Sequence, residues 1–182
     1  MSSSVKYGRL CISGNATIVL SVCLFASSII AQDAKLPEHE GSKELQKIKA
    51  LVGTWTGEMD MGKGPMPVKI VYRVTAAGSA VMETFNPGTP MEMITMYHDE
   101  KGKLAMTHYC MLANQPKMSL VKASDKKLAL DLVEDSGIKE GEPHMNALTI
   151  DFLDKDRIKH TWGCCQGGDK IVNMSVEFKR KK

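Results

Sequence analysis

Three side chains that can do chemistry occur within one short part of the sequence: Glu92, His108 and Cys110. A carboxylate, an imidazole and a thiol can bind a metal, or form a nucleophile with its base. A second pair, His160 and Cys164, lies in a later apolar run. We therefore consider four candidate ligands for zinc or copper: His108, Cys110, His160 and Cys164. Their spacing matches no recognised zinc motif, and buried Cys and His side chains more often serve only the core.

Sulfur-containing side chains leave two further alternatives open. Three cysteines follow the N-terminal region, Cys110, Cys164 and Cys165, and Cys110 can form a disulfide with either of the other two. Methionine is abundant, with 13 residues. Soft thioethers bind copper(I), but they more often fill irregular space in a core.

The N-terminus predicts export. Lys6 and Arg9 precede an apolar run at 16–26, and the following segment 27–31 ends in the small residue Ala31. This order is typical of a secretory signal peptide, so we expect residues 1–31 to be removed near Ala31 and the protein to be periplasmic or extracellular. A retained membrane anchor is the alternative, although the apolar run is short for a spanning helix. We expect no membrane span in the mature chain. The polar stretch 32–41 is expected to be a linker.

Residues 42–182 are expected to form one domain. Ser42 can cap a short helix, whose apolar positions Leu45, Ile48, Leu51 and Val52 are expected to lie on one buried side. After Gly53 the apolar residues alternate with polar ones, and turn residues separate the runs. Ten strands are expected, at 54–59, 68–74, 80–85, 92–98, 104–112, 118–123, 128–134, 146–153, 157–163 and 170–179. This pattern favours an all-β fold, an antiparallel up-and-down barrel with a short N-terminal helix.

One hairpin has a predicted register. A three-residue loop with Gly102 in the left-handed conformation pairs Asp99 with Lys103. Met96 then faces Met106, and Ile94 faces His108. This register predicts one inward face, which consists of Glu92, Ile94, Met96, His98, Leu104, Met106, His108 and Cys110. A tight two-residue loop or a four-residue loop would pair the faces differently.

Trp55 is expected to close one end of the barrel. It begins the first strand, and Gly53 and Gly57 on either side permit close approach of other backbone segments. This Gly-x-Trp-x-Gly motif after a short helix resembles the first strand of the lipocalin-related calycin barrels. The resemblance covers residues 42–182 at the level of pattern.

Two narrower resemblances follow from longer stretches. The segments 79–93, 97–98, 107–110 and 114–116 are similar to an uncharacterised family of secreted bacterial lipocalin-like proteins, which implies the barrel and no particular activity. The motif around Trp55 is also similar to that of nitrobindin-like haem barrels. In those proteins a third glycine follows, where this chain has Met59, and a histidine near the C-terminus binds the iron, to which only His160 could correspond.

The expected function is binding of a small apolar or amphipathic ligand inside the barrel. An enzyme, metal-binding or haem-binding protein that uses Glu92, His108 and Cys110 is one alternative, and a structural envelope domain with a filled barrel is another. Motifs of the common enzyme classes do not occur. The net charge is +3, and it is close to neutral once Lys6 and Arg9 are removed with the signal peptide, so nucleic acid has no support as a partner. Ten residues are candidates for the lining of the ligand cavity: Trp55, Glu83, Glu92, Met96, His98, Met106, His108, Cys110, His160 and Trp162.

Overall fold

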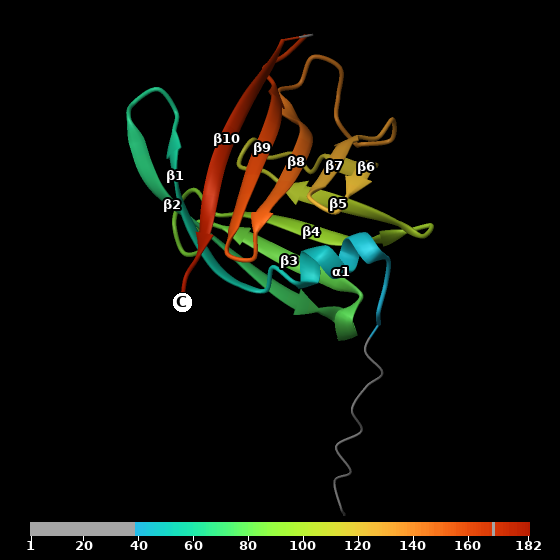
Figure 1. Ribbon diagram of the computed structural model, residues 1–182. Coiled ribbons are helices and arrows are strands. Elements are labelled where there is room, and N and C mark those ends of the chain that lie inside the picture. The colour runs from blue at the N-terminus through green and yellow to red at the C-terminus, as the bar shows by residue number, and fades with distance from the viewer. Residues whose placement is uncertain (1–38, 169) are drawn as a thin grey trace, which may run out of the picture. The chain divides into compact units, whose positions relative to one another are not determined.

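The computed structural model describes residues 39–168 and 170–182, which form a ten-stranded antiparallel barrel with one short α-helix (Figure 1). The helix is α1 (Lys43–Lys49), and a 3₁₀ turn, η1 (Ala76–Gly78), follows the second strand. The strands are β1 (Gly53–Asp60), β2 (Pro65–Thr75), β3 (Ala80–Phe85), β4 (Met93–Glu100), β5 (Lys103–Tyr109), β6 (Lys117–Ser124), β7 (Lys127–Leu132), β8 (His144–Asp154), β9 (Arg157–Cys165) and β10 (Ile171–Arg180). The predicted all-β up-and-down barrel with a short N-terminal helix is confirmed.

Each strand pairs with its neighbour in sequence, and β10 pairs with β1 to close the barrel. Because the chain runs up and down, alternate loops meet at the same end. We call the end that α1 covers the closed end. The other end, where the loops 61–64, 86–92, 110–116, 133–143 and 166–170 gather, is the open end.

The helix is held at the closed end by its N-cap. Ser42 accepts a hydrogen bond from Leu45 N through its Oγ at 3.0 Å, which satisfies one free donor of the first turn. Asp99, at the end of β4, accepts hydrogen bonds from Ser42 N at 2.6 Å and from Ser42 Oγ at 2.7 Å. The apolar face of the helix, Leu45 and Ile48, is fully buried. The predicted cap is therefore confirmed, and so is burial of Leu45, Ile48 and Leu51, whereas Val52, which was expected on the same side, lies beyond the helix and is 44% exposed.

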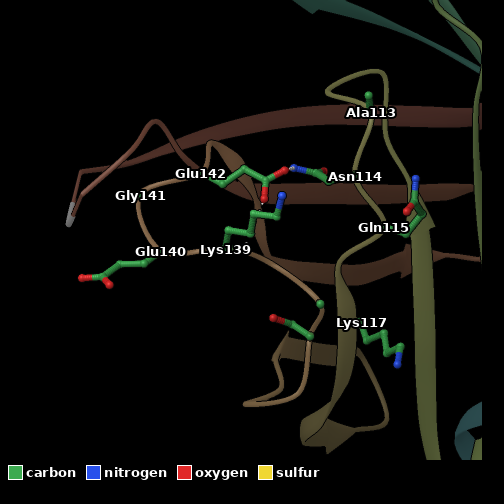
Figure 2. A pocket seen from close by; sticks show the side chains of 10 residues that line it. Ala113, Asn114, Gln115, Lys117, Lys139, Glu140, Gly141 and Glu142 are labelled. Atoms are coloured by element: carbon green, nitrogen blue, oxygen red, sulfur yellow. Dashed lines mark hydrogen bonds between the residues drawn. The ribbon is translucent and has the colours of Figure 1, made fainter.

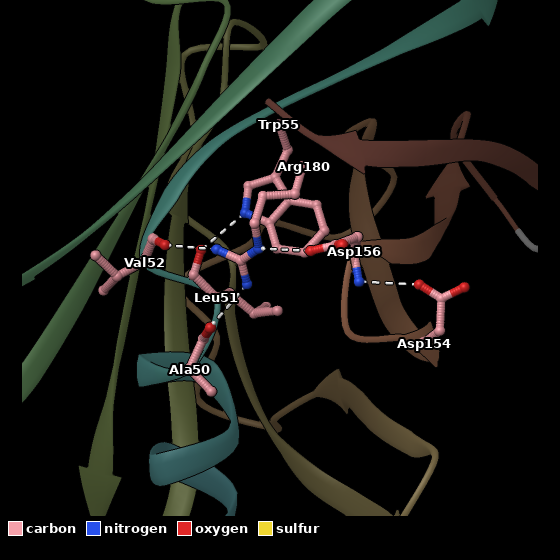
Figure 3. A network of polar contacts seen from close by, with 7 residues as sticks. All are labelled: Ala50, Leu51, Val52, Trp55, Asp154, Asp156 and Arg180. Carbon is pink, nitrogen blue, oxygen red and sulfur yellow. Dashed lines mark hydrogen bonds and ion pairs between the residues drawn. The ribbon is translucent and has the colours of Figure 1, made fainter. Parts of the chain in front are cut away.

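Trp55 lies at the closed end, where it is fully buried as expected. Its indole Nε1 donates to Leu51 O at 2.7 Å, and the Arg180 guanidinium lies 4.2 Å from the ring centroid (Figure 3). Position 57 requires glycine for a steric reason, because a Cβ there would lie 2.5 Å from Glu177 O of the adjacent strand β10. Trp55 thus closes the barrel together with α1 and the end of β10.

Arg180 joins the first and last strands to the helix. It donates to Val52 O at 2.7 Å and to Ala50 O at 3.0 Å, which are carbonyls at the C-terminal end of α1. Its Nε lies 3.6 Å from Asp156 Oδ1 in the β8–β9 turn. These contacts place a cation at the helix C-terminus, where the helix dipole favours one.

The predicted register of the β4–β5 hairpin is wrong by one residue. The turn has two residues, Lys101 (φ 51°) and Gly102 (φ 80°), so that Glu100 pairs with Lys103. Two positive φ values define the tight turn whose twist matches that of the strands, and Lys101 accepts the left-handed conformation that the prediction reserved for Gly102. A shift of one residue reverses the faces of β4. Thr95 and Tyr97 are therefore buried inside the barrel.

The predicted signal peptide (1–31) and its cleavage near Ala31 lie outside the described residues, as does most of the linker 32–41. The barrel belongs to a unit that spans Leu36–Lys182. Within the described residues, no helix has the length and apolar character that crossing a membrane requires.

Candidate functional site

Four polar residues form a row across the inner surface of β2 to β5. Tyr72 pairs with Glu83, Glu83 with Thr95, and Thr95 with His108 in successive strand registers. All four side chains are buried. Cross-strand partners in register bring their side chains together on one face of a sheet. We call this row the polar wall.

Hydrogen bonds satisfy the deeper part of the polar wall. Tyr97, next to the row on β4, donates from its hydroxyl to Glu83 Oε2 at 2.8 Å. The Tyr72 hydroxyl lies 2.9 Å from His160 Nε2. Burial, and then the negative charge of Glu83, raise the pKa of both tyrosines well above the ordinary value. The two hydroxyls therefore stay protonated, and each keeps a donor hydrogen.

His108 is the member of the polar wall with an unsatisfied atom. Its Nδ1 lies 2.9 Å from Thr95 Oγ1, but its Nε2 is buried and has no hydrogen-bond partner. Burial lowers the pKa of His108 to about 4, so the imidazole is neutral at pH 7. Leaving a buried polar atom without a partner costs about 1–3 kcal/mol. A buried polar atom without a partner is rare in folded proteins, and it calls for a physical explanation.

Opposite the polar wall lies an apolar one. Strands β6 to β10 place one row of side chains in register, which consists of Leu120, Leu130, Leu148, Trp162 and Met174. The two walls meet at His108 and Trp162, whose ring centroids are 4.8 Å apart. His160, one step toward the closed end on the same strand, packs edge-on against Phe178 at 5.3 Å.

Beyond the contact between His108 and Trp162, toward the open end, the side chains are less deeply buried. Five apolar or sulfur-containing side chains on this side pack against the core but are only half-buried, and we call them the mouth cluster: Met59, Phe85, Cys110, Cys164 and Met174. In contrast, Leu45, Ile48 and Trp55 at the closed end have no exposed surface. The inner side chains at the open end are therefore only partly covered by the rest of the chain.

Exposed apolar side chains gather around the same end. In the described part of the chain, nine large hydrophobic side chains are exposed, and six of them lie in loops or strand ends at the open end. These six are Met61, Met66, Tyr109, Met111, Leu112 and Ile171. An apolar group of this kind on a soluble surface marks a place where another apolar molecule binds or passes.

The cysteines at this end are thiols. Cys110, Cys164 and Cys165 are all free. Cys110 lies two residues beyond His108, and Cys164 two residues beyond Trp162, so both follow the contact between the walls. Burial raises the pKa of both thiols, and the negative charge of a Cys110 thiolate raises the pKa of Cys164 further. The predicted alternative of a disulfide from Cys110 is not realised.

A surface pocket of about 620 Å³ lies beside the mouth, between the β5–β6 and β7–β8 loops (Figure 2). Asn114 donates from Nδ2 to Glu142 Oε1 at 3.0 Å and to Pro143 O at 2.9 Å, and so fastens the two loops together. The hydrogen bond from Asn114 lowers the pKa of Glu142. Lys117 and Lys139 oppose Glu140 and Glu142 around the pocket, so its charges nearly balance.

The structure separates the residues that the sequence grouped as one site. Trp55, Glu83, Met106, His108 and His160 are buried in the barrel. Trp162 and Cys110 are half-buried at its open end. Glu92 is exposed in the β3–β4 loop, where it accepts a hydrogen bond from Gly88 N. Met96 and His98 lie on the outer face of β4, because the register differs by one residue.

The grouping of Glu92 with His108 and Cys110 is therefore wrong. Among residues 39–168 and 170–182, no three His, Cys, Asp or Glu side chains lie close enough together to hold a metal ion. His160 bonds to Tyr72 in the closed half, away from the thiols at the open end. The four predicted zinc or copper ligands do not form one cluster.

Sequence reasoning missed Tyr72, Thr95 and Tyr97. The available signal was the sequence Glu100-Lys-Gly-Lys103, which also fits a two-residue turn. Such a turn would have placed Thr95 and Tyr97 inside, opposite His108 and Met106. The contact between Asn114 and Glu142 joins residues 28 positions apart, and no local sequence pattern predicts it.

The fold and the interior define a class, a small antiparallel barrel with a closed, partly polar floor and an uncovered apolar mouth. No family model matches the sequence, and no curated protein matches it. A similar solved structure is a DUF3598 family protein of unknown function from Nostoc punctiforme PCC 73102 (TM-score 0.52, 13% identity). The match covers 74% of this chain and 49% of that protein, so this chain spans about half of its length.

Two further solved structures are less similar. Rv2717c from M. tuberculosis matches with a TM-score of 0.48 and 13% identity over 79% of this chain and 100% of that one. A redesigned β-barrel matches with a TM-score of 0.36 and 9% identity over 74% of this chain and 95% of that one. The similarity to the DUF3598 protein concerns the fold alone.

Proposed function

We propose that this protein binds a small, largely apolar molecule in the open half of its barrel. The observation that carries the proposal is the half-burial of the mouth cluster. Five apolar or sulfur-containing side chains remain partly exposed at the open end, whereas at the closed end Leu45, Ile48 and Trp55 are fully buried and only Val74 and Phe152 of the described core residues are half-buried. When a ligand covers apolar surface that is exposed to water, the complex is stabilised by about 25 cal/mol per Å² of that surface.

The rim supports the same function. The exposed methionines, together with Leu112 and Ile171, give an apolar molecule a favourable path to the interior. Methionine adapts to ligands of different shape because its side chain is unbranched and flexible. The short polar wall then offers hydrogen bonds at the bottom of the site. Sites of this kind, apolar with a few placed polar groups, are typical for small ligands.

We further propose a relationship to the calycin barrels and a location outside the cytoplasm. Three features support a calycin-type barrel: the Gly53-Thr-Trp-Thr-Gly57 motif, the short helix before it, and the stacking of Arg180 on Trp55. Residues 1–31 direct export, so the ligand is met in the periplasm or outside the cell. N-terminal sequencing of the protein from its native host tests the second point, because it would find an N-terminus near residue 32 rather than Met1.

Binding is tested with 1,6-diphenylhexatriene, an uncharged hydrocarbon that fluoresces in apolar surroundings. The protein is expected to bind one molecule with saturation. Two neighbouring residues on β10 supply a matched pair of variants. Met174→Arg introduces a charge at an inward position of the mouth cluster and should abolish the signal, whereas Asn173→Arg adds the same charge at an exposed, outward position and should leave it unchanged.

Equal binding by the two variants would contradict the proposal, because the dye would then bind elsewhere. No binding by the unmodified protein would favour a barrel that is filled by its own side chains and has a structural role.

A further inference from the structure

We propose that the ligand is uncharged, an apolar molecule with one hydroxyl or amide group that hydrogen-bonds to His108 Nε2. This inference rests on the proposed function and names the chemical class that the same site accepts. It follows from the charges of the described residues in the barrel interior and from His108 Nε2, which is buried there without a partner.

An anionic ligand would find no counter-charge inside. The buried polar side chains of the described residues include Glu83, His108 and His160, but no Lys or Arg. Arg180 is engaged at the closed end, with Trp55 and the carbonyls that end α1. A carboxylate buried without a cation loses its hydration and gains nothing comparable, which costs several kcal/mol. The nearest charged group would be Glu83, which has the same sign.

A cationic ligand would also be poorly served. Glu83 lies within the polar wall at 3% exposure, and its Oε2 already accepts the Tyr97 hydroxyl. Thr95 lies beside it on β4, and His108 follows on β5 in the same row. The imidazole of His108 is neutral at pH 7, because its pKa is lowered to about 4. An ammonium group at the level of His108 therefore meets an uncharged ring and apolar side chains.

The free nitrogen of His108 is placed to contact a ligand. Thr95 Oγ1 holds the ring through Nδ1, and Trp162 packs against the ring from the opposite wall. Nε2 is buried and has no partner, and it lies next to the half-buried Trp162, two residues before the half-buried Cys110. A neutral imidazole offers at Nε2 either a donor or an acceptor, according to the direction of the bond with Thr95. A hydroxyl or primary amide satisfies either case, whereas a carboxylate only accepts and an ammonium only donates.

The test uses three ligands with the same ten-carbon chain and different head groups: decan-1-ol, decanoate and decylamine. Each displaces bound diphenylhexatriene at pH 7.5. We expect decan-1-ol to displace the dye with an apparent Kd at least tenfold lower than those of decanoate and decylamine. Equal or tighter binding of decanoate or decylamine would overturn the inference, and so would failure of decan-1-ol to displace bound dye.

A variant separates the head-group contact from the apolar site. His108→Leu should retain diphenylhexatriene binding, which shows that the barrel is folded, and should weaken decan-1-ol about five- to tenfold, as expected for one hydrogen bond. Unchanged decan-1-ol affinity with intact dye binding would contradict the role of Nε2. Absence of dye binding to the unmodified protein is a different result, because it would contradict the proposed function itself.

Discussion

The two halves of this barrel differ in what completes them. At the closed end, α1 covers the interior, Trp55 is fully buried, and Arg180 satisfies the carbonyls at the end of the helix. At the open end, the mouth cluster is half-buried, and exposed apolar side chains surround it. The first half is completed by the chain itself. The second half has the composition of a core and lacks the covering element.

This difference separates stability from function along one axis of the molecule. Each deep polar group is hydrogen-bonded, as the pairs Tyr97–Glu83 and Tyr72–His160 show. The unpaired Nε2 belongs to His108, where the two halves meet. Substitutions in the closed half should therefore act mainly on the free energy of unfolding, and substitutions in the open half mainly on binding.

The largest expected effect compares the two tryptophans. Trp55→Ala removes a fully buried side chain and its hydrogen bond to Leu51 O, and should lower the free energy of unfolding by about 3–5 kcal/mol. Trp162→Ala removes a half-buried side chain and should cost about 1–2 kcal/mol. Urea unfolding followed by circular dichroism measures both. Similar losses for the two variants would remove the distinction between the halves.

The second effect is a dependence of stability on pH. Burial lowers the pKa of His108 from 6.5 to about 4, so between these values the unfolded chain binds a proton that the folded protein does not. The free energy of unfolding is therefore highest, as far as this residue decides it, above pH 6.5. It falls as the pH falls, and at pH 4 the loss due to His108 is about 3 kcal/mol. His160, whose pKa burial also lowers, adds a loss of the same sign.

Thermal unfolding of the unmodified protein and of His108→Gln between pH 4 and 8 measures this dependence. The variant should show a distinctly shallower fall in Tm below pH 6.5. Identical profiles would show that His108 does not stay neutral in the folded protein.

A smaller effect is expected from Arg180. Arg180→Met keeps the apolar stem and removes the guanidinium, which stacks on Trp55 and donates to Ala50 O and Val52 O. The loss should be about 1–2 kcal/mol in the free energy of unfolding. Lys179→Met, at the neighbouring exposed position, is the control and should change little. Diphenylhexatriene binding should persist in both, because Arg180 lies at the closed end.

The smallest effect is kinetic and concerns the thiols. Burial raises the pKa of Cys110 and Cys164, so iodoacetamide should react slowly at pH 7 and faster as the pH rises toward 9. Bound diphenylhexatriene should slow alkylation of these two residues of the mouth cluster. Cys165, which is buried and lies next to Gly168 O, should not change. Peptide mass spectrometry assigns the sites, and equal protection of all three cysteines would contradict the placement of the ligand.

Much of the fold was predictable from the sequence because its signals are local. Alternating residues, turn residues and Ser42 as a cap each act within a few positions, and Trp55 between two glycines marks the closed end. The interior was less predictable because one residue of register exchanges the faces of a strand. Lys101 in the left-handed conformation moved Met96 and His98 outward and Thr95 and Tyr97 inward. The contact between His108 and Trp162 joins strands that are not neighbours in the barrel, and no sequence spacing encodes it.

The most direct test of the two-half account uses ¹⁹F NMR of protein labelled with 5-fluorotryptophan. The chain has two tryptophans, one in each half, and Trp162→Phe assigns the two resonances. On titration with decan-1-ol, we expect a saturable shift of the Trp162 resonance and no change in that of Trp55. A shift of the Trp55 resonance with Trp162 unchanged, or no shift of either at saturating decan-1-ol, would contradict ligand binding in the open half.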